Sequence, residues 1–364
     1  MKGLGAWGLE GSSPIMHGHP TQITRLLLAL AIALVMGCQA AEPVARLHVL
    51  TGETMGTTYT VKVVDEGFGE DLLAELPSIV QGELDDVNTK MSHYLEDSEL
   101  SRLNRWRDET PFPVSGETMT VLEHAREISR LSGGAFDITV APLVDAWGFG
   151  PPGQPPEPPS AAEVDRLLEL VGWEKFELDQ VAGTVRKTIP ELTLDLSAIA
   201  KGYGVDQVAE ALDRAGVESY MVEVGGEIRT RGFNDEGAAW RIAIERPDPA
   251  GQALHLVVPL SDLSLATSGD YRNFYEIEGR RISHTIDPRT GHPITHHFTS
   301  ASVVTKECVR ADAWATALLV LGPEGIDLAE DLGLAAFFLE RNPEGGFTEH
   351  KTTAFDSLFD RISE

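Results

Sequence analysis

The sequence is poor in cysteine, in basic residues and in long apolar runs, and each shortage narrows what the protein can do. Only two of its 364 residues are cysteine. Its 29 basic residues face 57 acidic ones, a formal net charge of −28, which argues against nucleic acid as a partner because such binding depends on Lys and Arg. To bind an anionic ligand, such a protein would need a locally positive group at the site, such as a metal ion or backbone amides. The apolar run Leu26–Met36 is too short to span a bilayer.

That apolar run instead has the length expected of the core of a signal peptide. It follows Arg25 and leads into Val35–Cys38, a stretch that resembles a bacterial lipobox, in which the cysteine becomes the lipidated first residue. We therefore expect a signal peptide over 1–37, lipidation of Cys38, a tether over 38–48 and one domain over 49–364. An ordinary signal peptide cleaved near Ala40 and a start at Met16 are the alternatives.

Lipidation of Cys38 would leave Cys308 with no partner for an intramolecular disulfide. It would also place the protein on the periplasmic side of a bacterial membrane, held there by its lipid. Gln39, rather than an aspartate, follows the cysteine and favours the outer over the inner membrane.

The order of the predicted elements indicates an α+β fold. Helical spacing or capping predicts helices over 70–91, from 98, over 114–132, 161–171 and 199–215, and a last one from about 325. Strand patterns cover 48–65, 176–193, 220–224, 228–232, 240–246, 254–259, 264–267, 273–277 and 335–340. Helices cluster early and strands late, without βαβ alternation, which favours a single α+β domain over a Rossmann fold. Gly225-Gly226-Glu227 lacks the spacing of a dinucleotide fingerprint.

Chemistry-bearing residues gather between Arg280 and Gly322. His284 and Asp287 directly precede a Pro-Arg-Thr-Gly turn. Asp312 and Thr316 are four apart in a segment with helical composition, so they would project from one face. Oxygen ligands suit a hard cation such as Mg²⁺. Each residue also has a plainer interpretation: a hydrogen-bonded histidine, a turn or capping aspartate, and a small core threonine.

Four further motifs join this stretch and together carry a resemblance. They are MGTTY (55–59), GGAFDI (133–138), DLSAIAKGY (195–203) and VEVGG (222–226), followed by SHTIDPRTG (283–291) and ADAWATAL (311–318). In this order they resemble the ApbE family of FAD:protein FMN transferases, over roughly residues 48 to 345. The resemblance implies an α+β, T-fold-like single domain with a mainly antiparallel sheet and flanking helices.

The implied activity is Mg²⁺-dependent transfer of FMN from FAD to a threonine hydroxyl, which forms a phosphoester and releases AMP. Typical acceptors in the family are subunits of the sodium-pumping NADH:quinone reductase and of Rnf-type redox complexes. The rival interpretations are a Mg²⁺-dependent FAD pyrophosphatase that releases FMN and AMP, and a lipid-anchored flavin-binding protein without catalysis.

The resemblance also implies site residues. The metal ligands would be Asp312, Thr316 and the backbone carbonyl of Ala198; some relatives carry an acid where this chain has Ala315. The FAD contacts carried over are Met55, Tyr94, Ala135, Phe136, Asp137, Asp195, Lys201 and the backbone near Thr285. His284 is the candidate general base, because a histidine titrates near neutral pH, and we expect Asp287 to orient either that ring or the turn.

Overall fold

The computed structural model describes residues 46–108, 110–150, 157–247, 253–270, 273–277 and 280–362. Residues Ala45–Glu364 form one compact unit. The predicted signal peptide over 1–37, the lipidation site Cys38 and most of the predicted tether over 38–48 lie outside the described residues. Strand β1 begins at Arg46, so residues 46–48 of the predicted tether belong to the sheet.

No helix in the described part of the chain combines the length and the apolar character needed to cross a membrane.

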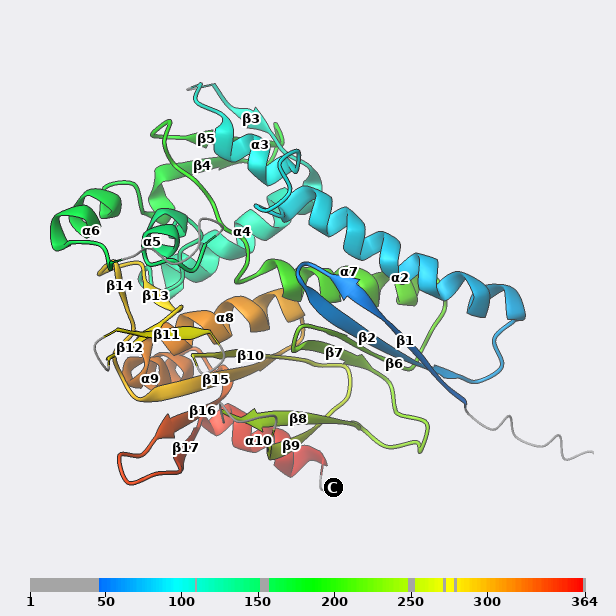
Figure 1. The fold of residues 1–364 in the computed structure, drawn as a ribbon. Coiled ribbons are helices and arrows are strands. Elements are labelled where there is room, and N and C mark those ends of the chain that lie inside the picture. Colours follow the sequence, from blue (N-terminus) through cyan, green and yellow to red (C-terminus); the bar gives the residue numbers. More distant parts are fainter. Residues whose placement is uncertain are drawn as a thin grey trace, which may run out of the picture. The chain divides into compact units, whose positions relative to one another are not determined.

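A single antiparallel sheet forms the centre of this unit (Figure 1). In spatial order its strands are β1 (Arg46–Thr54), β2 (Thr57–Asp65), β6 (Tyr220–Val224), β7 (Glu227–Arg231), β10 (Ser264–Gly269), β15 (Phe298–Thr305), β16 (Ala335–Arg341) and β17 (Phe347–Lys351). Every neighbouring pair is antiparallel. The predicted α+β fold with a mainly antiparallel sheet is therefore confirmed.

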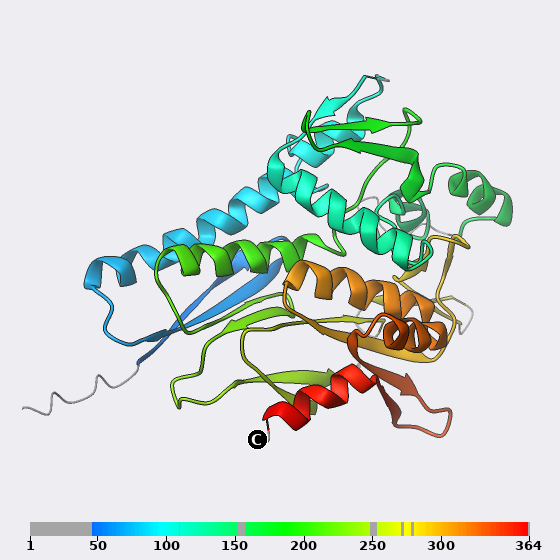
Figure 2. The same ribbon diagram turned by 180° about the vertical axis from the view of Figure 1, so that it is seen from behind.

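Helices cover one face of the sheet. They are α2 (Glu70–Met91), α3 (Glu99–Arg105), α4 (Gly116–Leu131), α5 (Ala141–Ala146), α6 (Ala161–Leu168), α7 (Ala200–Arg214), α8 (Cys308–Leu321) and α9 (Pro323–Asp331). Of these, α7 and α8 lie directly on the sheet, and α2 and α4 pack over them (Figures 1 and 2). The opposite face is covered by α10 (Thr353–Ile362) and by the hairpin of β8 (Trp240–Arg246) and β9 (Ala253–Leu260).

The alternation of side chains along the strands explains why both faces can be covered. On β15, Val303 packs among the residues around α8, whereas its neighbour Val304 packs with Phe337 and Phe355 on the other face. The elements predicted from the sequence do not include β15, β17 or α10. Helix α10 is short, and it is the burial of Phe355 against the sheet, a tertiary contact, that holds it.

Smaller sheets surround the centre. They are β3 (Phe112–Pro113), β4 (Phe176–Asp179) and β5 (Thr184–Lys187); β11 (Phe274–Ile277) and β12 (Arg280–Ser283); and β13 (Ile286–Asp287) and β14 (His292–Pro293). The predicted 176–193 hairpin thus ends at Lys187, and 188–194 is a connecting segment. The β13–β14 pair closes around the predicted Pro-Arg-Thr-Gly turn.

A two-residue turn joins β1 to β2 and directs Met55 toward α7. Met55 (φ 47°) and Gly56 (φ 72°) both have positive φ, as tight hairpin turns of the primed type require. The Met55 methyl group lies over Gly204 of α7, where an added Cβ would stand only 2.9 Å from Met55 Cε. The absence of a side chain at Gly204 therefore allows the turn to pack on the helix.

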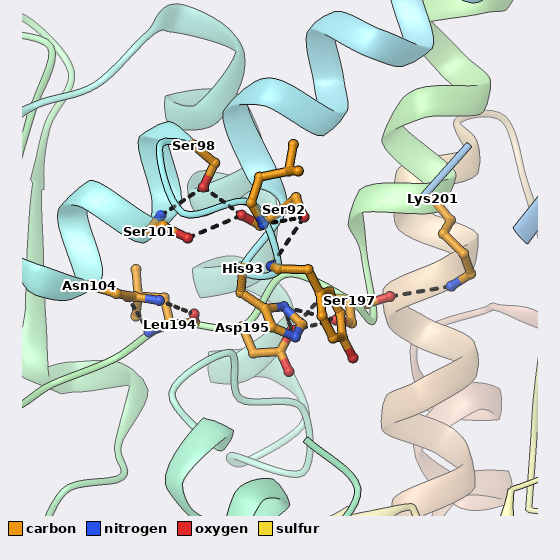
Figure 3. Close-up of polar contacts among 11 residues, drawn as sticks. Ser92, His93, Ser98, Ser101, Asn104, Leu194, Asp195, Ser197 and Lys201 are labelled. Atoms are coloured by element: carbon orange, nitrogen blue, oxygen red, sulfur yellow. Dashed lines mark hydrogen bonds and ion pairs between the residues drawn. The ribbon is translucent and has the colours of Figure 1, made fainter. Parts of the chain in front are cut away.

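The segment 188–194, which leads into Asp195, is fixed by two buried polar residues. Lys187 is 5% exposed, and its Nζ donates to the carbonyls of Pro190 (3.0 Å) and Leu192 (3.1 Å). Asn104 makes two hydrogen bonds of 2.8 Å to the backbone of Leu194 (Figure 3). Burial, with a smaller contribution from Arg107, lowers the pKa of Lys187 to about 8.

We expect Lys187→Met to lower the free energy of unfolding by about 2 kcal/mol at pH 7, where the ammonium is still mostly charged, because buried carbonyls lose their donor. Denaturant unfolding measures the change. The matched control is the neighbouring Arg186→Met, whose salt bridge with Glu177 is exposed and which should change stability by less than about 0.5 kcal/mol. An equal decrease in the free energy of unfolding for the two variants would contradict the conclusion that Lys187 stabilises the segment 188–194.

Candidate functional site

The start of α7 and the middle of α8 meet through a buried carboxylate. Asp312 is 2% exposed, and its Oδ2 accepts the backbone N–H of Gly202 at 2.9 Å, across 110 residues of sequence. A Cβ at position 202 would lie 2.4 Å from the carbonyl oxygen of Cys308, so only glycine permits this approach. In a continuous helix the Gly202 amide would instead reach back to the Ala198 carbonyl, four residues earlier.

A lysine lies between two acids at this junction. Lys201 Nζ is 3.6 Å from Asp312 Oδ1 and 3.6 Å from Glu227 Oε1, and it donates to the Ser197 carbonyl at 3.3 Å. Burial raises the pKa of Glu227 to about 8; Lys201 opposes this rise and Asp312 adds to it. Burial acts to lower the pKa of Lys201, but Asp312 and Glu227 outweigh it and hold that pKa above its ordinary value. The second Glu227 oxygen, Oε2, is buried and has no hydrogen-bond partner among the described residues.

Hydroxyl groups continue the site one turn along α8. All of α8 is buried except Arg310 and Thr316. Thr316 Oγ1 lies 2.9 Å from Ser268 Oγ at the end of β10. The predicted metal ligands Asp312 and Thr316 therefore share a helix face. Asp312 also accepts the amide of Gly202, which belongs to the same motif (195–203) as Ala198, the third predicted ligand. All three proposed donors are oxygens, which fits a hard cation. Among the described residues, no group of three or more His, Cys, Asp or Glu side chains forms a metal site.

His284 has a defined ring orientation. Its Nδ1 lies 3.0 Å from the carbonyl oxygen of Asn273, and a carbonyl can only accept, so Nδ1 carries the hydrogen and Nε2 remains free to accept a proton. The edge of the ring packs on Phe149, with 6.2 Å between centroids. Burial lowers the pKa of His284; the Asn273 carbonyl opposes this shift, and the charges of Lys201 and Arg281 add to it.

Asp287 serves the turn in this structure. Its carboxylate accepts from the Arg289 backbone N–H (2.9 Å) and from Arg289 Nε (2.9 Å) and Nη2 (2.8 Å). The backbone oxygen of Asp287 accepts from the Gly291 amide at 2.8 Å. Of the two roles expected from the sequence, these contacts support the turn, whereas the His284 ring is oriented by Asn273.

The predicted flavin contacts fall into two groups. Tyr94 is 68% exposed; Asp195 lies on the segment that enters α7, and Lys201 lies in the first turn of α7, on the other side of Ser197 (Figure 3). By contrast, the side chains of Ala135, Phe136, Asp137 and Thr285 are buried. Asp137 is already bonded to protein donors: the Thr139 amide and hydroxyl and the Trp173 amide, at 2.7 to 2.8 Å. Burial raises the pKa of Asp137, and these hydrogen bonds oppose the rise.

Four polar residues at this site were not predicted from the sequence: His93, Ser197, Glu227 and Ser268. His93 Nδ1 lies 3.3 Å from Asp195 Oδ1, and Ser197 Oγ donates to the same oxygen at 2.6 Å. Ser197 and Glu227 lay within or beside motifs that were already recognised, so an acid following Gly225-Gly226 was a usable signal. Nothing local in the sequence marks His93 or Ser268, since only the folded chain brings them to α7 and α8.

Comparison with known proteins gives a consistent assignment. The model of the ApbE family matches residues 55–338. A Vibrio cholerae protein named FAD:protein FMN transferase is 42% identical over 332 residues, covering 90% of this chain and 97% of its own. A protein of the same name from Haemophilus influenzae is 40% identical over 334 residues, covering 90% and 96%.

Comparison with solved structures gives the same family assignment. The flavin transferase ApbE from Vibrio cholerae superposes with a TM-score of 0.79 at 40% identity, covering 86% of this chain and 99% of that one. The apo form of the Pseudomonas stutzeri flavinyl transferase ApbE gives a TM-score of 0.77 at 40% identity, covering 86% and 97%. The motifs occur in the expected order, the fold matches that of solved family members, and the buried Asp312 carboxylate is bonded to the motif that begins α7. The chain therefore belongs to the ApbE family.

Proposed function

We propose that this protein is a Mg²⁺-dependent FAD:protein FMN transferase that moves FMN from FAD to a threonine hydroxyl of a target protein and releases AMP. The observation that carries the proposal is the hydrogen bond from Gly202 to Asp312. It brings the proposed flavin-binding segment, with Asp195 and Lys201, to the proposed metal ligands. The relatives named for this activity cover nearly the whole chain, which supports the same conclusion.

The oxygens at the α7–α8 junction are suited to hold Mg²⁺. Asp312, Thr316 and the Ala198 carbonyl are the proposed ligands. Bound there, Mg²⁺ would neutralise charge on the FAD diphosphate, which a protein with a net charge of −28 would otherwise repel. Lys201 adds a second positive charge beside the same carboxylate, in a position to contact phosphate.

His284 is suited to act as the base. The acceptor threonine oxygen attacks the FMN-side phosphorus, its proton passes to Nε2 of His284, and the bond from that phosphorus to the AMP oxygen breaks. A phosphoester forms and AMP leaves, so atoms and charges balance. The Nδ1 contact with Asn273 would keep Nε2 available as the proton acceptor throughout.

The cellular setting is part of the same proposal. The lipobox-like Val35–Cys38 supports a lipid anchor on the periplasmic side of a bacterial membrane, the outer membrane being favoured by Gln39. Acceptors there would be subunits of the sodium-pumping NADH:quinone reductase or of Rnf-type complexes.

The function is tested by incubating the protein with FAD and Mg²⁺, with and without a candidate acceptor domain. Transfer predicts AMP and a fluorescent, mass-shifted acceptor only when the acceptor is present. AMP released at full rate without an acceptor would indicate an FAD pyrophosphatase instead. Bound flavin without AMP under either condition would indicate a storage protein.

For the base, His284→Gln should reduce transfer at least about 100-fold while FAD still binds, because the ring is not needed to hold the ligand. In the wild-type protein the lowered pKa keeps His284 neutral into mildly acidic solution. Transfer should therefore persist below pH 6.5, the ordinary histidine value, and decline only as the pH falls through the lowered pKa. A pH–rate profile under saturating FAD measures this; a decline that begins above pH 7 would contradict it.

For the metal, Lys201→Met should lower the free energy of unfolding by about 2 kcal/mol in EDTA, because the buried carboxylate of Asp312 loses its cation. Mg²⁺ should then raise the melting temperature of this variant more than that of the wild type. Asp312→Asn should abolish the Mg²⁺ response. The control is Arg214→Met on the same helix, whose bridge to Glu83 is exposed. Identical Mg²⁺ responses in all four proteins would contradict the site.

A further inference from the structure

The carboxylate of Asp195 has one oxygen occupied by the protein and one available. Oδ1 accepts the Ser197 amide at 2.8 Å and the Ser197 hydroxyl at 2.6 Å. His93 Nδ1 lies 3.3 Å from the same oxygen, at ion-pair distance, and 3.5 Å from Ser197 Oγ, so it contacts the Asp195–Ser197 pair. Among the residues that the structure describes, none donates to Oδ2. The carboxylate is therefore held by one oxygen and presents the other to a ligand.

The same histidine ring supports Tyr94. The ring centroids of His93 and Tyr94 are 4.1 Å apart, with 37° between their planes. The His93 side chain is 17% exposed, whereas Tyr94 is 68% exposed. His93 thus lies between a largely buried carboxylate and an exposed aromatic ring, and it contacts both.

The loop that carries these two rings is anchored from behind, as Figure 3 shows. The Ser92 carbonyl accepts from the hydroxyls of Ser98 and Ser101, and Ser92 Oγ accepts the Tyr94 amide at 3.2 Å. Ser98 also caps α3. The backbone that carries His93 is therefore held between the end of α2 and the start of α3, by contacts that do not involve Asp195.

The charges around this ring favour the pairing. Burial disfavours protonation of His93, but Asp195 and then Asp145 outweigh it and raise its pKa. Burial acts to raise the pKa of Asp195, yet His93 and Ser197 hold it below its ordinary value. Asp195 therefore stays ionised as an acceptor although its surroundings are largely dry.

We propose that His93 is a positioning residue for FAD: its Nδ1–H fixes Asp195 so that Oδ2 accepts a ribose hydroxyl or adenine amino group, and its ring holds Tyr94 for stacking on the ligand. This inference rests on the proposed function, because it takes FAD as the ligand of Asp195 and Tyr94. It assigns His93 to ligand affinity and not to the transfer step.

Two substitutions separate the two contacts. His93→Asn keeps an N–H at the place of Nδ1 but removes the ring, and His93→Phe keeps a ring beneath Tyr94 but removes the donor. His93→Ala removes both. We expect His93→Ala to raise the Kd and the KM for FAD about tenfold, the size of one charge-assisted hydrogen bond. The kcat should stay within about twofold, and each of the other variants should recover part of the loss.

The full-length protein is titrated with FAD, monitored by flavin fluorescence, in the absence of acceptor, and transfer kinetics are then measured with acceptor. The control is His255→Asn. His255 of β9 makes a comparable contact with Glu349 of β17 (2.8 Å), and its substitution should leave Kd unchanged. An unchanged Kd in His93→Ala, or a fall in kcat with KM unchanged, would overturn the inference. So would the absence of any recovery in both other variants.

The binding arm also separates this inference from the proposed function. If FAD binds and the variants follow the expected order but no flavin is transferred, the positioning role stands and the transferase proposal fails. If the wild-type protein binds no FAD, both fail.

Discussion

A buried carboxylate that must be satisfied organises this protein. Asp312 lies on a helix with almost no exposed surface, where an unpaired negative charge would be strongly destabilising. It is stabilised by a backbone N–H from α7 and by the ammonium of Lys201. The second acid, Glu227, shares that ammonium. The helices α7 and α8 are thereby joined at the point where the predicted ligand-binding motifs converge.

The helix α8 needs a second carboxylate for the same reason. Its N-terminal amides are buried, and no side chain of its own caps them. Asp206 of α7 accepts from the amides of Cys308 and Val309, both at 2.9 Å, and pairs with Arg229 of β7. Asp206 and Asp312 thus bond the two helices to each other at points one turn apart. Arg229 of β7 supplies the counter-charge to Asp206, and Lys201 of α7 supplies the counter-charge to Asp312.

Much of the fold could be predicted from the sequence, because periodicity and turn chemistry are local properties. The helix over 70–91, the β structure over 48–65 and the end of α4 just before Gly133-Gly134 follow from them directly, whereas the hairpin turn at Met55-Gly56 was not predicted. Strand order could not be predicted, since β2 pairs with β6 across more than 150 residues and depends on packing. Among the site residues, Asp312 and Thr316 were found from helical spacing. His93 and Ser268 were not, because their significance lies in contacts made by distant segments.

The close approach at Gly202 has a thermodynamic consequence. Because backbone meets backbone there, with no flexible side chain between the helices, the oxygens around Asp312 are held in place before any ligand arrives. Preorganised groups of this kind lose little conformational entropy on binding and need little reorganisation as charge develops. Affinity at this junction should then derive from the electrostatics of the ligand itself. A single methyl group added at position 202 would disturb the arrangement of these oxygens more than most changes to the residues that touch the ligand.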